Sequence, residues 1–214
     1  IEEVEERLST IDLGALMSYP KDLMVFYHPE TLKQLCALRA YFLDKQQKGG
    51  LDKADMWIRL VAINRLTGHS NGFFSVYTLP PNQAVSIDSQ RKINAKRSQQ
   101  PPIRDIKKII IKKSKSLLKA LNQEERSRMS SVTSRIRMLT KTAEAVPEIK
   151  ERSVALVVTS PPFLDVVDYA QDNWLRCWFC GIDPKSVPIT MSKKVEDWQD
   201  VMTNVFKELE RVLK

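Results

Sequence analysis

The sequence has few of the residues that hold very small or membrane-embedded proteins together. Three cysteines among 214 residues cannot all pair with one another, which argues against a disulfide scaffold and favours a reduced, cytoplasmic setting. The longest apolar runs are a few residues long, whereas a helix that crosses a bilayer needs about 20. We therefore expect a cytoplasmic protein without a membrane partner.

Glycine is also scarce. The six glycines never occur as G-x-G, so the sequence contains neither a phosphate-binding loop nor a dinucleotide-binding fingerprint. His28 and His69 have no second histidine at helical spacing, and the pair Cys177 and Cys180 has no second C-x-x-C to complete a zinc site. We predict no metal site and interpret the cysteines as buried and inert.

Positive charge is abundant and is concentrated in one region. The net charge is +8. Residues 1–30 carry seven acidic and two basic side chains, whereas residues 91–141 carry 16 lysines and arginines and three acidic side chains. Such a regional excess is typical of a lobe that faces a polyanion, although a solvated charged face is the alternative. The residues that we predict to contact a nucleic acid are Lys107, Lys108, Lys112, Lys115, Arg135, Asn82 and Gln83.

Apolar spacing predicts helices along most of the chain. The predicted helices cover residues 29–46, 52–66, 103–121, 124–142, 168–180 and 195–213. Met56 and Leu60 are among the residues that we expect to face inward. Residues 68–82 are predicted to form a loop, with an extended piece at 73–77 whose aromatic side chains either contact bases or pack on the helices.

A different pattern begins at residue 153. Residues 153–159 (SVALVVT) form a short apolar run without alternation, which predicts a buried strand of a parallel sheet. Thr159-Ser160-Pro161-Pro162-Phe163 follows, and two consecutive prolines cannot continue the hydrogen bonding of a strand. Open α/β sheets bind their ligands beyond the carboxyl ends of the strands, so we predict a functional site here.

This segment resembles the catalytic motif of S-adenosylmethionine-dependent DNA amino-methyltransferases, which modify the exocyclic amino group of cytosine (N4) or of adenine (N6). The resemblance consists of S-P-P-F after an apolar strand and before L-D-x-x-D-Y-A-x-x-N-W-L. It implies that Ser160 and the carbonyl of Pro161 accept hydrogen bonds from the exocyclic amino group of a flipped base. It also implies that Phe163, where tyrosine is usual, stacks on that base. The implied catalytic residues are Ser160, Pro161, Pro162 and Phe163, in the serine form commoner among enzymes that act on N4 of cytosine.

The resemblance implies S-adenosylmethionine as the cofactor, with Thr159, Ser160 and Asp165 near it. Asp165, Asp168 and Asn173 follow the motif and are candidates for lining the pocket or orienting the methionine end of the cofactor. For Asp165 and Asp168, capping of the helix that follows is an equally good interpretation. The family's Asp-Pro-Phe-x-Gly-x-Gly loop, which holds the methionine part of the cofactor, has no counterpart in this sequence. We therefore expect the chain to be a segment of a longer enzyme and to be inactive alone. A companion restriction enzyme is a further partner that the resemblance suggests.

Together these features predict an α/β fold, namely part of a Rossmann-like methyltransferase sheet with a predominantly helical insert. The expected domains are a tail of a cofactor-binding half (1–20), a helical and basic DNA-binding insert (21–147) and a catalytic half (148–214). Two alternatives stay open. One is an RNA amino-methyltransferase, and the other is a noncatalytic helical protein that binds nucleic acid and uses residues 160–163 only as a turn.

Overall fold

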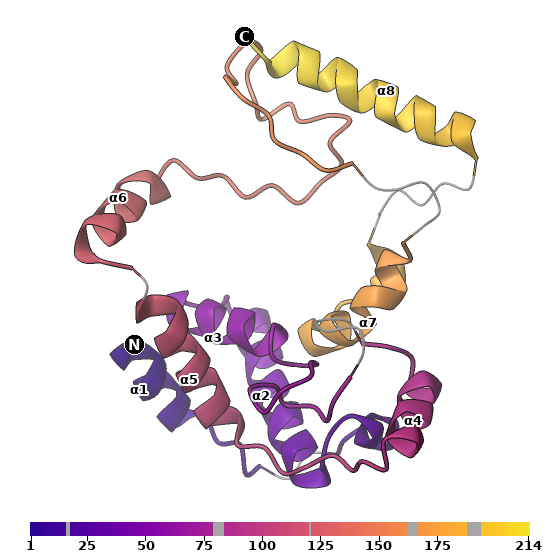
Figure 1. Cartoon of the computed structure of the whole chain (residues 1–214). Coiled ribbons are helices and arrows are strands. Elements are labelled where there is room, and N and C mark those ends of the chain that lie inside the picture. Colours follow the sequence, from indigo (N-terminus) through magenta and orange to yellow (C-terminus); the bar gives the residue numbers. More distant parts are fainter. Residues whose placement is uncertain (16–17, 79–83, 120, 162–166, 188–193) are drawn as a thin grey trace. The chain divides into compact units, whose positions relative to one another are not determined.

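The computed structural model describes residues 1–15, 18–78, 84–119, 121–161, 167–187 and 194–214 (Figure 1). Helix accounts for 57% of the chain and strand for only 2%. The described residues form no sheet, so the prediction of an α/β fold with a Rossmann-like sheet is wrong and the protein is mainly helical. Within the same residues, no helix is long and apolar enough to cross a membrane.

The chain divides into two compact units. The first unit comprises Ile1–Arg128 and Gln171–Pro184, and the second comprises Met129–Ala170 and Lys185–Lys214. The first unit contains nearly all of the buried side chains, whereas Met202 and Val212 are the buried ones among the described residues of the second. The three domains expected from the sequence remain a prediction.

Helices build most of both units. The helices of the first unit are α1 (Glu2–Thr10), the 3-10 helix η1 (Lys21–Val25), α2 (Pro29–Gln47), α3 (Lys53–Ile63), α4 (Ile87–Lys96), α5 (Ile106–Lys119) and most of α7 (Tyr169–Cys180). The remaining elements are α6 (Gln123–Thr133), the 3-10 helix η2 (Pro184–Ser186) and α8 (Val195–Val212). In the first unit α1 packs against α3 and α5, and α5 also packs against α2 (Figure 1).

α2 supplies the centre of the first unit's core. The ring nitrogen Nδ1 of His28 accepts a hydrogen bond from the N–H of Glu30, and Pro29 occupies the first turn, as its position in the sequence predicts. The largest buried side chains of this helix are Leu32, Leu35, Leu38 and Phe42. The helix therefore begins and packs as its apolar spacing indicates.

α3 shows where apolar spacing misleads. Asp52 and Asp55 form a capping box that starts the helix, and Ile58 and Val61 are buried. Met56 and Leu60, which we predicted to face inward, are 53% and 54% exposed. Apolar residues surround most of this short helix, so the pattern alone does not define the buried face.

α5 is shorter than predicted and buries a polar residue. Ile106 and Ile110 are fully buried, as expected, whereas Leu117 is 42% exposed. The next buried position of the helix is Ser114, whose hydroxyl accepts a hydrogen bond from Nε1 of Trp57 at 2.9 Å. This bond satisfies both groups and joins α5 to α3.

The aromatic loop belongs to the core. The N–H of Val76 donates to the carbonyl of Phe26 at 2.8 Å, and the rings of Phe73 and Phe74 are buried. A Cβ added at Gly68 would lie 2.5 Å from the ring of Phe73, so this close approach requires glycine. Phe73 and Phe74 therefore pack on the helices, which leaves them unable to contact a base.

α8 organises the second unit through polar contacts. The guanidinium of Arg211 donates to the carbonyls of Val146 and Ile149, both at 3.1 Å, and pairs with Glu208 at 2.6 Å. Glu208 also accepts a hydrogen bond from the N–H of Val146 at 2.7 Å. Arg211, followed by the Val146 N–H, lowers the pKa of Glu208 to about 2. These contacts hold residues 146–149 along the helix.

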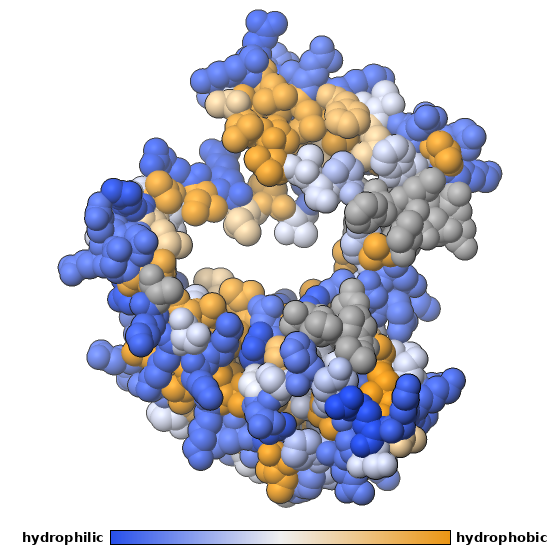
Figure 2. Space-filling view, in the orientation of Figure 1, coloured by the Kyte–Doolittle hydropathy of each residue, from blue (hydrophilic) through white to orange (hydrophobic). Residues whose placement is uncertain are grey.

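The predicted buried strand at residues 153–159 is wrong. The N–H of Val154 donates to Val212, and its carbonyl accepts from Lys214, which gives one isolated parallel bridge, Val154 to Leu213. Leu156 and Val158 are 75% and 87% exposed, because no neighbouring strand among the described residues covers them. Figure 2 shows apolar surface gathered over the part of the second unit around α8.

Candidate functional site

The S-P-P segment lies in the second unit and follows the bridge residue Val154 along the chain. Thr159, Ser160 and Pro161 are exposed and have no regular secondary structure. The hydroxyl of Ser160 and the carbonyl of Pro161 have no hydrogen-bond partner among the residues that the structure describes, so both are available as acceptors. Pro162 and Phe163, which complete the predicted motif, lie outside the described residues, as does Asp165.

The residues after the motif form a core helix. α7 begins at Tyr169, and Leu175 is buried in the first unit. The indole N–H of Trp174 donates to the carbonyl of Ala84 at 3.0 Å, and its ring lies 6.0 Å from that of Phe26. The N-W-L part of the motif therefore has a packing role in the first unit, as its helical spacing indicates.

Of the three cysteines, which we predicted to be buried, Cys36 is buried, whereas Cys177 and Cys180 are only partly buried. Burial, followed by the neighbouring Cys180, raises the pKa of Cys177. Burial also raises the pKa of Cys36, to about 11. A nucleophilic or redox-active cysteine needs a lowered pKa. No three potential metal ligands are grouped among the residues that the structure describes.

Two of the four lysines predicted to bind DNA on α5 contact α1 or the residues that follow it. Lys107 donates to the carbonyl of Ile11 at 2.8 Å and is partly buried. Lys115 pairs with Glu5 of α1 at 2.7 Å. These contacts hold α1 and the residues after it against α5, so neither lysine is simply a free surface charge.

A stripe of exposed lysines remains on α5. Lys108, Lys112, Lys115 and Lys119 are exposed and follow one another three or four positions apart, which places them on one face of the helix. Lys108 pairs with Asp105 at 3.2 Å, whereas Lys112 and Lys119 make no ion pair within the described part of the chain. We call these four residues the lysine stripe.

The other predicted DNA contacts belong to other parts of the chain. Arg135 is exposed and belongs to the second unit, whereas the lysine stripe belongs to the first. Asn82 and Gln83 lie outside the described residues. Within the described part of the first unit, the predicted contacts are the lysines of α5, which share one helix.

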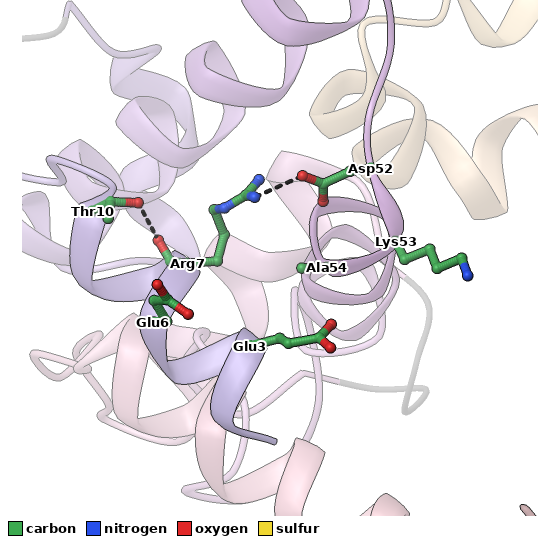
Figure 3. A pocket seen from close by; sticks show the side chains of 7 residues that line it. All are labelled: Glu3, Glu6, Arg7, Thr10, Asp52, Lys53 and Ala54. Carbon is green, nitrogen blue, oxygen red and sulfur yellow. Dashed lines mark hydrogen bonds and ion pairs between the residues drawn. The ribbon is translucent and has the colours of Figure 1, made fainter.

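A charged pocket that the sequence analysis missed lies between α1 and α3. Its volume is about 530 Å³, and it is lined by Glu3, Glu6, Arg7, Thr10, Asp52, Lys53 and Ala54 (Figure 3). Arg7 points across it to Asp52, at 2.6 Å, and Arg7 also pairs with Asp55 at 2.6 Å. The guanidinium of Arg7 is thus already paired with two carboxylates. We interpret these ion pairs as a clamp that holds α1 against α3. The capping spacing of Asp52 and Asp55 was the one sequence signal for it.

The N–H of Asp55, and then Arg7, lower the pKa of Asp52 to about 2. The carboxylates, Asp52 first, raise the pKa of Arg7. Both groups are therefore charged at neutral pH, which suits a permanent ion pair. A proton-transfer group would need a pKa near the working pH.

Comparison of the chain with protein-family models, with curated proteins and with solved structures found no match.

Proposed function

We propose that this chain is part of an S-adenosylmethionine-dependent DNA methyltransferase that acts on N4 of cytosine. The observation that carries the proposal is the long motif S-P-P-F-L-D-x-x-D-Y-A-x-x-N-W-L, which resembles the catalytic segment of that family. The exposed position of Ser160 supports it, as does the carbonyl of Pro161, which accepts no hydrogen bond from the residues that the structure describes, because both groups must be open to a base.

The chemistry assigned to the motif is hydrogen-bond acceptance. An exocyclic amino nitrogen is a weak nucleophile because its lone pair is delocalised into the ring. Acceptors at Ser160 Oγ and the Pro161 carbonyl would hold its two N–H groups and favour a pyramidal nitrogen with an available lone pair. The base must leave the duplex to reach them, which an exposed segment permits.

The chain's residues fit the amino group better than they fit the cofactor. S-adenosylmethionine would supply the methyl group. The glycine-rich loop that holds its methionine part in the family is missing from the sequence, and Asp165 lies outside the described residues. Thr159 and Ser160 remain predicted cofactor contacts, and we assign no cofactor role to any other described residue.

The lysine stripe supports duplex DNA as the substrate. Lysines on one helix face can neutralise successive phosphates and release their counterions, which makes affinity strongly dependent on salt. The stripe belongs to residues 91–141, a region that contains 16 basic and three acidic side chains. A restriction enzyme as companion, and a location in the cytoplasm, belong to the same proposal.

The test is transfer of a labelled methyl group from S-adenosylmethionine by the full-length protein that contains this chain. We expect label on duplex DNA, at N4 of cytosine. Ser160→Ala should lower transfer at least about a hundredfold, the scale of losing one acceptor in a preorganised site, while DNA affinity changes less than twofold. Ser153→Ala, an exposed serine before the motif, is the matched control and should retain activity.

The other outcomes identify the alternatives. Label on RNA instead of DNA would indicate the RNA enzyme. DNA binding without transfer to either nucleic acid would indicate the noncatalytic protein, which the mainly helical fold also accommodates. Full activity of Ser160→Ala would reject the role assigned to Ser160.

A further inference from the structure

A small cavity in the first unit has a lining that suits a planar heteroaromatic ring. Its volume is about 280 Å³, near the lower end of the range for small-molecule sites. The cavity is lined by Ser18, Tyr19 and Pro20 before η1, by Arg39 and Ala40 of α2 and by Trp178 of α7. It therefore combines two aromatic side chains with one planar cation.

Arg39 is held at the cavity by Trp178. Its Nε donates to the carbonyl of Trp178 at 2.6 Å, and its guanidinium carbon lies 5.2 Å from the centre of the Trp178 ring. The terminal nitrogens of Arg39 have no hydrogen-bond partner in the described part of the chain. The hydroxyl groups of Ser18 and Tyr19 have none there either. The cavity thus offers oriented donors that the fold does not use.

This combination of side chains restricts the kinds of ligand that the cavity can bind. Indole and phenol rings provide stacking surfaces for a flat ring. A guanidinium pairs in bidentate fashion with two adjacent acceptors, which guanine presents at O6 and N7. Adenine places an amino donor next to N7, which would oppose the donors of Arg39. We propose that the cavity binds guanine, either as an unpaired base of single-stranded DNA or as a free nucleotide.

The remaining reactive group of the cavity does not suggest other chemistry. Cys36 also lines it, but its raised thiol pKa keeps the sulfur protonated at neutral pH. The site is therefore a binding site and not a nucleophilic centre. It lies in the first unit and uses none of the motif residues, so it is independent of the proposed methyl transfer.

Calorimetric titration with three probes tests the proposal. Guanosine 5′-monophosphate should bind roughly tenfold more tightly than adenosine 5′-monophosphate, because one bidentate contact is lost with adenine. Ribose 5-phosphate, which has no base, should bind at least tenfold more weakly than the guanine nucleotide. Equal affinities for the guanine nucleotide and ribose 5-phosphate would overturn the proposal, since phosphate alone would then be bound.

Variants on α7 provide a matched pair. Trp178→Leu should weaken binding of guanosine 5′-monophosphate about tenfold by removing a stacking surface. Trp174→Leu lies one helical turn away and outside the cavity lining, and should leave the affinity unchanged once thermal melting shows a folded protein. Tyr19→Leu disturbs no hydrogen bond of the described residues and should also weaken binding. It replaces Trp178→Leu as the test if that variant does not fold. Unchanged affinity in both Trp178→Leu and Tyr19→Leu would overturn the proposal.

Competition distinguishes the two sources of the base. A single-stranded oligonucleotide with one guanine should displace the nucleotide if nucleic acid is the source, and its adenine counterpart should not. Displacement by free guanine nucleotides alone would assign the same pocket to a small-molecule ligand. Ser160→Ala should bind guanosine 5′-monophosphate normally, so loss of methyl transfer and loss of this site are separate results.

Discussion

Asp55 illustrates how one side chain connects distant parts of the sequence. It is fully buried and accepts hydrogen bonds from Arg7 at 2.6 Å, Lys45 at 2.8 Å and Tyr41 at 2.9 Å. Burial acts to raise the pKa of Asp55, but the bonds from Lys45, Arg7 and Tyr41 outweigh it and lower the pKa. The ionised carboxylate therefore joins α1, α2 and α3.

Removal of this carboxylate should destabilise the first unit. We expect Asp55→Ala to lower the free energy of unfolding by about 2–3 kcal/mol, because two cations and a phenol lose their acceptor while both cations keep partial access to water. Urea denaturation followed by circular dichroism measures the loss. Asp44→Ala, which removes an exposed carboxylate paired with Lys48, is the control and should cost less than about 0.5 kcal/mol. Equal losses in the two variants would contradict the clamp.

Asp52 gives this clamp a pH dependence. Because its pKa in the folded protein is lowered from 3.8 to about 2, its contribution to stability is complete above about pH 4 and is lost as the pH falls toward 2. Asp52→Asn keeps a helix cap but has no charge to lose. Between pH 5 and pH 2.5, its free energy of unfolding should therefore fall less than that of the parent. Denaturation curves across this range measure the difference, and Asp88→Asn, which removes an exposed carboxylate, is the control. Parallel stability profiles for Asp52→Asn and the parent would contradict this prediction.

The limits of prediction at this scale are physical. The spacing of Asp52 and Asp55 indicates a helix cap, because capping is local and depends on residues three positions apart. The pairing with Arg7 is not local, because Asp52 lies 45 positions and Asp55 lies 48 positions after Arg7 in the sequence. It depends on how α1 packs against α3. Likewise, the spacing of Ser160 and Pro161 marks a motif, but the lining of the guanine pocket comes from three separate segments that only folding brings together.

At the scale of elements, α5 determines where positive charge is displayed. Its buried side carries Ile106 and Ile110, and the exposed side carries the lysine stripe. Helix positions and much of the core were predictable, because apolar residues recur at helical spacing over residues 29–46 and 103–121. By contrast, the apolar run at 153–159 led to a wrong prediction of a strand. A strand forms only when neighbouring strands pair with it, and the sequence of the run does not show whether such neighbours exist.

The lysine stripe should carry a measurable share of DNA binding. Lys112→Gln combined with Lys119→Gln should reduce the slope of log affinity against log salt by about 1.8, at about 0.9 for each lost phosphate contact on duplex DNA. Fluorescence anisotropy with a labelled duplex between 50 and 200 mM salt, roughly the range over which such contacts are lost, measures the slope. Lys53→Gln is the matched control, because Lys53 is an exposed helix lysine that lines the acidic pocket of α1. A slope unaffected by the double variant would remove the lysine stripe from the interface.

At the scale of the whole molecule, the boundary between the acidic and basic segments of the sequence does not coincide with the boundary between the two units. The acidic residues 1–30 and most of the basic region belong to the same unit, where α1 packs against α5 and Glu5 pairs with Lys115. Part of the acidic segment therefore neutralises part of the basic one. The second unit holds the S-P-P segment and few buried side chains, so stability and the predicted chemistry reside mainly in different units.

The bond between Trp57 and Ser114 has a consequence for recognition. The buried side of α5 carries Ile106 and Ile110, and Ser114 continues that side one turn beyond them, away from the lysine stripe. A rotation that withdrew Ser114 from Trp57 would leave an indole N–H without its acceptor and would turn a lysine toward the core. A single neutral hydroxyl thus acts together with the buried isoleucines to fix the direction in which the helix presents its charge to a polyanion.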